Sequence, residues 1–353
     1  MIFRVSALLA AVLLAGTPSA HAQLRGHGGP VRALALSADG TTALSGSFDG
    51  SAILWSLPRS AATQVLRFHD DAVNAVALLK DGRAVTAGAD GRIAVWTAGR
   101  DQPDTVLQGH TATVAALGIS PDGATLASAS WDHTLRLWPL AGGAPHVLEG
   151  HAQNVNGVAF TPDGKAVVSA AYDLTLRIWP LDGAAPTIVT LPAPLSAVAI
   201  APDGEIVAAG ANGMVYFLKS SGEISGEVQA APTPVIGLAV SPDGALVAAA
   251  SIRGSVAIIE RRERKLAHTL VGPGLPVWSV AFMPDSRTLL TGGNDRLIRR
   301  WNAATGDPVG SAMMTGPDDP LAAYANDPGA EVFRACVACH TLSPDEGNRA
   351  GPT

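Results

Sequence analysis

Apolar and polar residues alternate in seven short segments of the chain, and each segment leads into a turn. In the third unit, for example, "VAALGIS" is followed by the turn "PDG", then by "TLASAS" and, after a second turn, by "TLRLW". Alternation with a period of two residues indicates strands with one buried face, and Asp-Gly turns between them indicate hairpins. The pattern therefore predicts short antiparallel strands joined by tight turns.

The turns recur at a nearly constant interval along the chain. Their Asp residues are Asp39, Asp81, Asp122, Asp163, Asp203, Asp243 and Asp285. A period of roughly 40 residues is typical of repeat proteins, so the spacing predicts seven like units. The centre of each unit's first strand is small, which suits strands crowded round a shared axis; these residues are Ala35, Ala77, Gly118, Ala159, Ala199, Ala239 and Ala281.

Four residue types recur at fixed places in the first four units. The sets are His27, Ser45, Asp49 and Trp55; His69, Thr86, Asp90 and Trp96; His110, Ser128, Asp132 and Trp138; and His151, Ser169, Asp173 and Trp179. The units resemble the WD-repeat β-propeller family over residues 24 to about 310. The resemblance implies an all-β, seven-bladed propeller in which each set is hydrogen-bonded and fixes the turns of its blade.

The last three units depart from this pattern. The fifth has Asn212 and Leu218 in place of Asp and Trp, and the sixth has Arg253 and Ile259. The seventh keeps Thr291, Asp295 and Trp301 without a matching His. We expect these blades to be held mainly by apolar packing. Because the His and Asp residues recur at the same place in successive units, we interpret them as structural rather than as catalytic or metal-binding pairs.

Composition supports a globular, strand-rich protein and narrows its partners. The chain is 47% hydrophobic and 15% charged, with 38 Gly and 25 Pro, which argues against disorder. Its net charge is -6 and it has no basic run, so nucleic acid and anionic membrane surfaces are poor candidates for partners.

The N-terminal stretch up to Ala22 has the pattern of a secretory signal peptide. Arg4 supplies the positive start, residues 5–15 form the apolar core, and Ala20-His21-Ala22 is a small-x-small cleavage site. The alternative is a membrane anchor, but the apolar run is too short to span and Pro18 interrupts it. We expect cleavage after Ala22, and a periplasmic protein without a membrane span.

The two cysteines of the chain stand in one motif, Cys336-Val337-Ala338-Cys339-His340. A disulfide across two intervening residues would constrain little, so a chemical role is favoured. Cys-x-x-Cys-His is the motif of c-type haem attachment, in which the thiols bond the vinyl groups and the imidazole ligates the iron. The alternatives are a redox pair, half of a zinc site, or chance.

The flanks of this motif resemble the opening of class I cytochrome c. Gly329 and Phe333 match the first helix of that family, and Gly351-Pro352 match the pair that follows the haem motif. The resemblance implies one covalent haem c held by Cys336, Cys339 and the proximal ligand His340, with the Pro352 carbonyl orienting the imidazole. It covers residues 326–353, too few for a whole domain, so we expect a short α-helical segment of an incomplete cytochrome domain.

The expected organisation is therefore a signal peptide (1–22), a propeller (23–310), a linker (311–325) and the start of a cytochrome domain (326–353). We expect residues 306–320 to contain a last edge strand before the linker. The residue directly before the Asp of each four-residue set, or before its replacement in the later units, should lie on one shared rim, where aromatic side chains suit a protein interface. We expect a docking patch of Phe48, Trp131, Tyr172 and Trp278, unless these rings lie flat against neighbouring turns.

The resemblances together imply an exported electron carrier whose propeller docks a redox partner. Nothing in the repeats has the pattern of a phosphate-binding loop or a nucleophile with its base, so we expect a carrier rather than an enzyme. One alternative is a scaffold whose cytochrome segment is vestigial or sensory. Another is the electron-transfer subunit of a periplasmic dehydrogenase complex.

Overall fold

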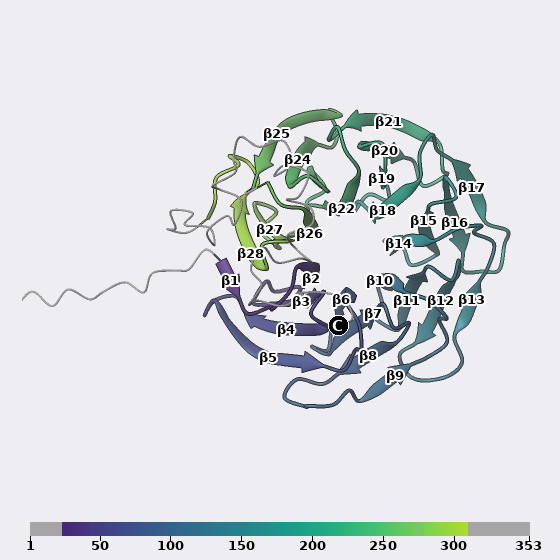
Figure 1. Cartoon of the computed structure of the whole chain (residues 1–353). Helices are drawn as coiled ribbons and strands as arrows, with labels where there is room; N and C mark the ends of the chain where they lie inside the picture. Colours follow the sequence, from purple (N-terminus) through teal and green to yellow (C-terminus); the bar gives the residue numbers. More distant parts are fainter. Residues whose placement is uncertain (1–22, 273, 310–353) are drawn as a thin grey trace, which may run out of the picture.

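The chain forms a closed ring of seven four-stranded antiparallel sheets (Figure 1). The structure, a computed structural model, describes residues 23–272 and 274–309. Every helix or strand within those residues is a β-strand, so the prediction of an all-β, seven-bladed propeller is confirmed. In this described part, the chain contains no helix of the length and apolarity that crossing a membrane requires.

Each of the first six blades consists of four consecutive strands, numbered from the ring axis outwards. Blades one to three are β2 (Val31–Leu36), β3 (Thr42–Ser47), β4 (Ser51–Ser56), β5 (Ala61–Arg67); β6 (Val73–Leu78), β7 (Ala84–Gly88), β8 (Ile93–Trp96), β9 (Thr105–Leu107); and β10 (Val114–Ile119), β11 (Thr125–Ser130), β12 (Leu135–Pro139), β13 (His146–Leu148). Blades four to six are β14 (Val155–Phe160), β15 (Ala166–Ala171), β16 (Thr175–Pro180), β17 (Thr187–Thr190); β18 (Leu195–Ile200), β19 (Ile206–Gly210), β20 (Met214–Leu218), β21 (Ile224–Gln229); and β22 (Val235–Val240), β23 (Leu246–Ser251), β24 (Ser255–Glu260), β25 (Lys265–Val271).

The seventh blade joins the two ends of the propeller. Its inner strands are β26 (Val277–Phe282), β27 (Thr288–Gly293) and β28 (Leu297–Asn302), and its outer strand is β1 (Gln23–Arg25) from the start of the described chain. Leu24 pairs with Ile298, so the purple and yellow-green ends of the ribbon meet in one sheet (Figure 1). We expected a last edge strand within residues 306–320. The described part of it, 306–309, forms no strand but a single bridge from Pro308 to Trp301, and β1 is the edge strand beside β28; residues 310–320 lie outside the described residues.

The inner strands of neighbouring blades contact one another all round the ring, including β2 with β26. The small residues expected at their centres explain this closeness. At Gly118 an added Cβ would come within 3.3 Å of the Val158 carbonyl oxygen of the next blade. The hydrophobic core lies between blades, as where Val85 and Val95 of blade two pack with Trp138 of blade three.

Candidate protein-docking rim

The His, Ser or Thr, Asp and Trp sets are hydrogen-bonded inside their blades, as the sequence predicted. In blade three, His110 Nδ1 lies 2.7 Å from Asp132 Oδ2, and its Nε2 lies 2.7 Å from Ser128 Oγ. Trp138 Nε1 donates to the same Ser128 Oγ at 2.8 Å. Blades one, two and four repeat these contacts. The sets hold the blade turns together and belong to the interior of the blades.

Electrostatics in blade four agree with this structural role. Burial acts to raise the pKa of Asp173, but hydrogen bonds from the Thr175 side chain, the Ala152 N–H and His151 outweigh it and lower the pKa to about 2. Burial also lowers the pKa of His151, more than its bond to Asp173 raises it. Blade four therefore holds an ionised Asp beside a neutral His at neutral pH.

Blades five and six replace the set by apolar packing and by ion pairs. In blade five, Asn212 Nδ2 donates to the buried Tyr216 hydroxyl at 2.8 Å. The buried Arg261 of blade six bonds Asp203 and Glu205 of blade five at 2.6 and 2.7 Å. Arg264 pairs with the same Glu205. The expectation of apolar packing therefore omitted a charged cluster that ties these two blades together.

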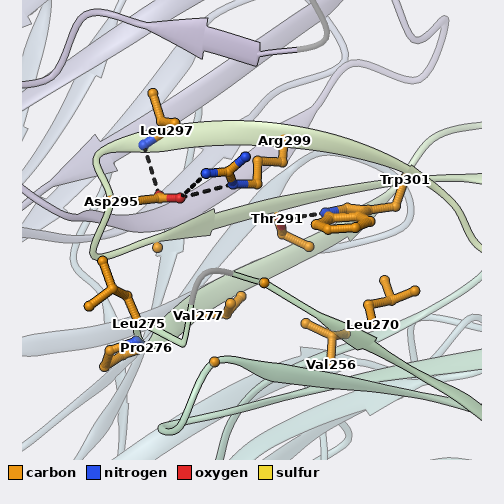
Figure 2. A pocket seen from close by; sticks show the side chains of 13 residues that line it. Val256, Leu270, Leu275, Pro276, Val277, Thr291, Asp295, Leu297, Arg299 and Trp301 are labelled. Atoms are coloured by element: carbon orange, nitrogen blue, oxygen red, sulfur yellow. Dashed lines mark hydrogen bonds and ion pairs between the residues drawn. The ribbon is translucent and has the colours of Figure 1, made fainter. Parts of the chain in front are cut away.

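Blade seven keeps three members of the set and uses an Arg in place of the His. Trp301 Nε1 donates to Thr291 Oγ1 at 2.9 Å, and Arg299 pairs with Asp295 at 2.7 Å (Figure 2). A cavity of about 20 Å³ lies between these residues and Val256 of blade six. Its volume suits about one water molecule, so this cavity is too small for a substrate or cofactor.

Seven turn residues gather at one end of the ring, which we call the top end. Each lies in the turn between the second and third strands of its blade, directly before the Asp of the set or the residue that replaces it. Its N–H donates to the carbonyl of the residue just before the inner strand of the same blade. These residues are Phe48, Ala89, Trp131, Tyr172, Ala211, Ile252 and Asn294. The prediction that they share a rim is confirmed.

The predicted aromatic patch divides into two kinds of residue. Trp131 and Tyr172 are 43% and 40% exposed. Phe48 and Trp278 are half-buried, with ring centroids 5.6 Å apart, so the alternative of packing against neighbours applies to this pair. Ile252, which the sequence reasoning left out of the patch, is 38% exposed on the same rim.

A β-bulge in every inner strand adds a second ring of side chains to the top end. The register of each inner strand shifts at its second residue, and such bulges redirect a side chain. The seven bulge residues are Arg32, Asn74, Ala115, Asn156, Ser196, Ile236 and Trp278. Together with the seven turn residues they form what we call the docking rim.

Contacts between blades position the aromatic side chains of the docking rim. Trp131 Nε1 of blade three donates to Asn156 Oδ1 of blade four at 3.0 Å, and Asn156 Nδ2 donates to the Leu195 carbonyl of blade five. Trp278 Nε1 donates to Asn294 Oδ1 at 3.0 Å, and the Arg32 guanidinium lies 5.4 Å from the Trp278 ring centroid. The Trp131 indole is thus held in place while it stays 43% exposed, as suits an anchor of an interface, whereas the Trp278 indole is partly covered by Phe48 and Arg32.

The opposite, bottom end of the ring carries a carboxylate in every blade. There, the turn between the first two strands of every blade holds an Asp, from Asp39 in blade one to Asp285 in blade seven. In Asp122, hydrogen bonds from the Ser120 side chain and the Ala124 N–H lower the pKa, and the pKa of the other six is lowered as well. The bottom end therefore presents seven carboxylates; the fourteen residues of the docking rim include none, although Asp49, Asp90 and their counterparts stand directly beside them at the top end.

The residues expected to hold a haem, Cys336, Cys339, His340 and Pro352, lie outside the described residues. The same is true of the signal peptide at 1–22 and of the helical segment at 326–353. These expectations stay predictions from the sequence.

Comparisons with known proteins agree with the repeat architecture. The model of the family described as IFT122 first beta-propeller matches residues 72–312, and that of the WD domain, G-beta repeat matches residues 19–56. A segment of 44 residues is 48% identical to the WD repeat-containing protein 26 homolog of Arabidopsis thaliana. That segment is 12% of this chain and only 8% of the plant protein.

Proposed function

Because the chain belongs to the WD-repeat β-propellers, in the family described as IFT122 first beta-propeller, we propose that it is a scaffold that binds other proteins on its docking rim. The observation that carries the proposal is the pair of exposed aromatic residues, Trp131 and Tyr172, on a rim built from all seven blades. Exposed aromatic side chains on short turns between rigid strands bind protein partners at low entropic cost.

Site-specific photo-crosslinking in the producing cell tests this proposal. A photoreactive phenylalanine analogue replaces Trp131 on the docking rim or, as a control, Val65, which is 47% exposed on the outer strand β5. We expect a discrete protein adduct from position 131 that position 65 does not give. Equal adducts from both positions, or none from position 131, would contradict a docking function for this rim.

We propose further that the scaffold is exported and carries a c-type haem on Cys336, Cys339 and His340, with Pro352 beside the His. The support is the spacing of the Cys-x-x-Cys-His motif and its match to the cytochrome c opening. A bound haem would supply one-electron cycling of its iron, and the two thiols and one imidazole would hold it. The docking rim would then position an electron-transfer partner.

A pyridine-haemochrome spectrum and a haem-stained gel of the exported chain test this second proposal. We expect covalent haem in the wild-type chain and none in Cys336→Ser/Cys339→Ser. Wild-type chain without covalent haem would end the electron-transfer hypothesis and leave the scaffold proposal intact. Co-purification of a redox enzyme would favour a role as the electron-transfer subunit of a dehydrogenase complex.

A further inference from the structure

The docking rim has a single charged residue, whose charge, within the part of the chain that the structure describes, faces an aromatic ring and no carboxylate. Among its fourteen members there is one Arg and no Lys, Asp or Glu. Arg32, the bulge residue of blade one, lies over the Trp278 ring and is half-buried. Within residues 23–272 and 274–309 its guanidinium makes no hydrogen bond or ion pair. The guanidinium nitrogens are therefore free to bond an incoming group.

The surroundings of Arg32 favour an anion at this point. Burial among neighbouring residues lowers the pKa of Arg32, and the charge interaction with Tyr172 opposes this effect. Tyr172 belongs to blade four, whereas Arg32 belongs to blade one. The guanidinium stays charged, and a partly desolvated charge without a partner gains more than a solvated one from a charge-assisted hydrogen bond.

We propose that Arg32 binds a carboxylate of the partner protein, an Asp or Glu side chain with apolar neighbours, at the centre of the docking rim. The planar guanidinium matches a carboxylate with two parallel hydrogen bonds. The exposed Trp131, Tyr172 and Ile252 would receive the apolar side chains that flank this carboxylate. The proposal deepens the scaffold function and rests on it.

The single cation among the docking-rim residues suits a carboxylate better than a larger anion. A phosphate group or a nucleic acid backbone is usually bound by several cations together, whereas the docking rim offers one. Arg32, lying on the Trp278 ring, therefore offers one attractive contact for a single acidic side chain of a partner.

Selection from a phage library of random dodecapeptides tests the proposal on the full-length chain. We expect the peptides enriched on wild-type protein to carry Asp or Glu beside apolar residues. Replacing that acid by its amide, or Arg32 by Met, should lower the affinity of a selected synthetic peptide at least about tenfold. The control Arg67→Met removes the same charge from the exposed end of the outer strand β5 of the same blade, and should leave the affinity unchanged. Thermal unfolding confirms that each variant is folded.

The outcomes separate this inference from the scaffold proposal. Selected peptides that lack an acid, or that bind Arg32→Met as tightly as wild type, would overturn the role of Arg32. If such peptides still lose affinity for Trp131→Ala/Tyr172→Ala, the docking rim stands as a binding surface. Peptides that bind all rim variants equally would contradict both proposals, and a library without any enriched peptide would overturn carboxylate recognition.

Discussion

The short strand β1 closes the ring, because it is the outer strand of blade seven and pairs with β28. The stability of the propeller should therefore depend on it. Leu24 is 2% exposed and packs with Ile53, Trp55 and Ile298, residues of blades one and seven. Replacing Leu24 by Ala removes three carbon atoms, which amounts to about 2.4 kcal/mol at about 0.8 kcal/mol per buried methylene. The cavity left behind adds to this cost, so we expect the free energy of unfolding to fall by about 3 kcal/mol.

Guanidinium unfolding, followed by tryptophan fluorescence, measures this loss. The matched control is Leu266→Ala on the outer strand β25, where the side chain is 38% exposed, and we expect less than about 1 kcal/mol there. Hydrogen exchange should also accelerate in β28, because β1 is its hydrogen-bonded neighbour. The reasoning is refuted if Leu24→Ala costs no more than the control, or if exchange in β28 is unchanged.

Three further predictions concern the contacts that hold the blades. Ser128→Ala should lower the free energy of unfolding by about 2 kcal/mol, because Trp138 Nε1 and His110 Nε2 both lose a buried partner; a loss below about 0.5 kcal/mol in a denaturant titration would contradict this. Because the folded pKa of Asp173 is lowered to about 2, its ionisation stabilises the protein above about pH 4, and this contribution disappears as the pH falls from about 4 to 2. Between about pH 5 and pH 2, the free energy of unfolding should therefore fall by about 2 kcal/mol less in Asp173→Asn than in wild type. An equal fall in both proteins, measured by unfolding curves, would refute the assignment. Arg261→Met should cost about 2 kcal/mol, because it leaves Asp203 unpaired and Glu205 with Arg264 as its remaining partner, and a neutral effect in calorimetry would show that apolar packing alone joins blades five and six.

Local pattern was sufficient to predict the repeated part of the fold. The alternating strands, the Asp turns and the sets from His27 to Trp179 recur from one unit to the next, and each describes contacts inside one blade. Period and hydrogen-bonding chemistry therefore led to the seven blades and to the shared rim of turn residues. Blade seven follows the same pattern in part: Trp301 still donates to Thr291, while Asp295 pairs with Arg299 in the absence of a His.

Contacts between distant segments could not be predicted in the same way. The strand β1 is very short and pairs with β28 at the other end of the propeller sequence, so no local periodicity marks it. Arg261 and Glu205 lie on different blades, and neither stands at a repeated position of the pattern. The bulges are hidden because the apolar alternation continues through them, from Val31 to Ala33 in blade one.

One signal for the docking rim was present in the sequence. Aligning the seven units places Arg32 at a position where the other six have uncharged residues. A single charge at a repeated position indicates a role outside the common fold. The sequence did not predict that Arg32 lies over the Trp278 indole, because Trp278 belongs to blade seven and is far from Arg32 in the sequence.

Binding of partners to the docking rim is tested most directly by titration calorimetry with the crosslinked partner once it is purified. We expect Trp131→Ala/Tyr172→Ala to weaken binding by about a hundredfold or more, as the loss of two interface anchors would. We expect no change for Val65→Ala/Ile188→Ala, which truncates side chains 47% and 53% exposed on outer strands. Equal affinity for wild type and the rim variant would contradict docking on this rim.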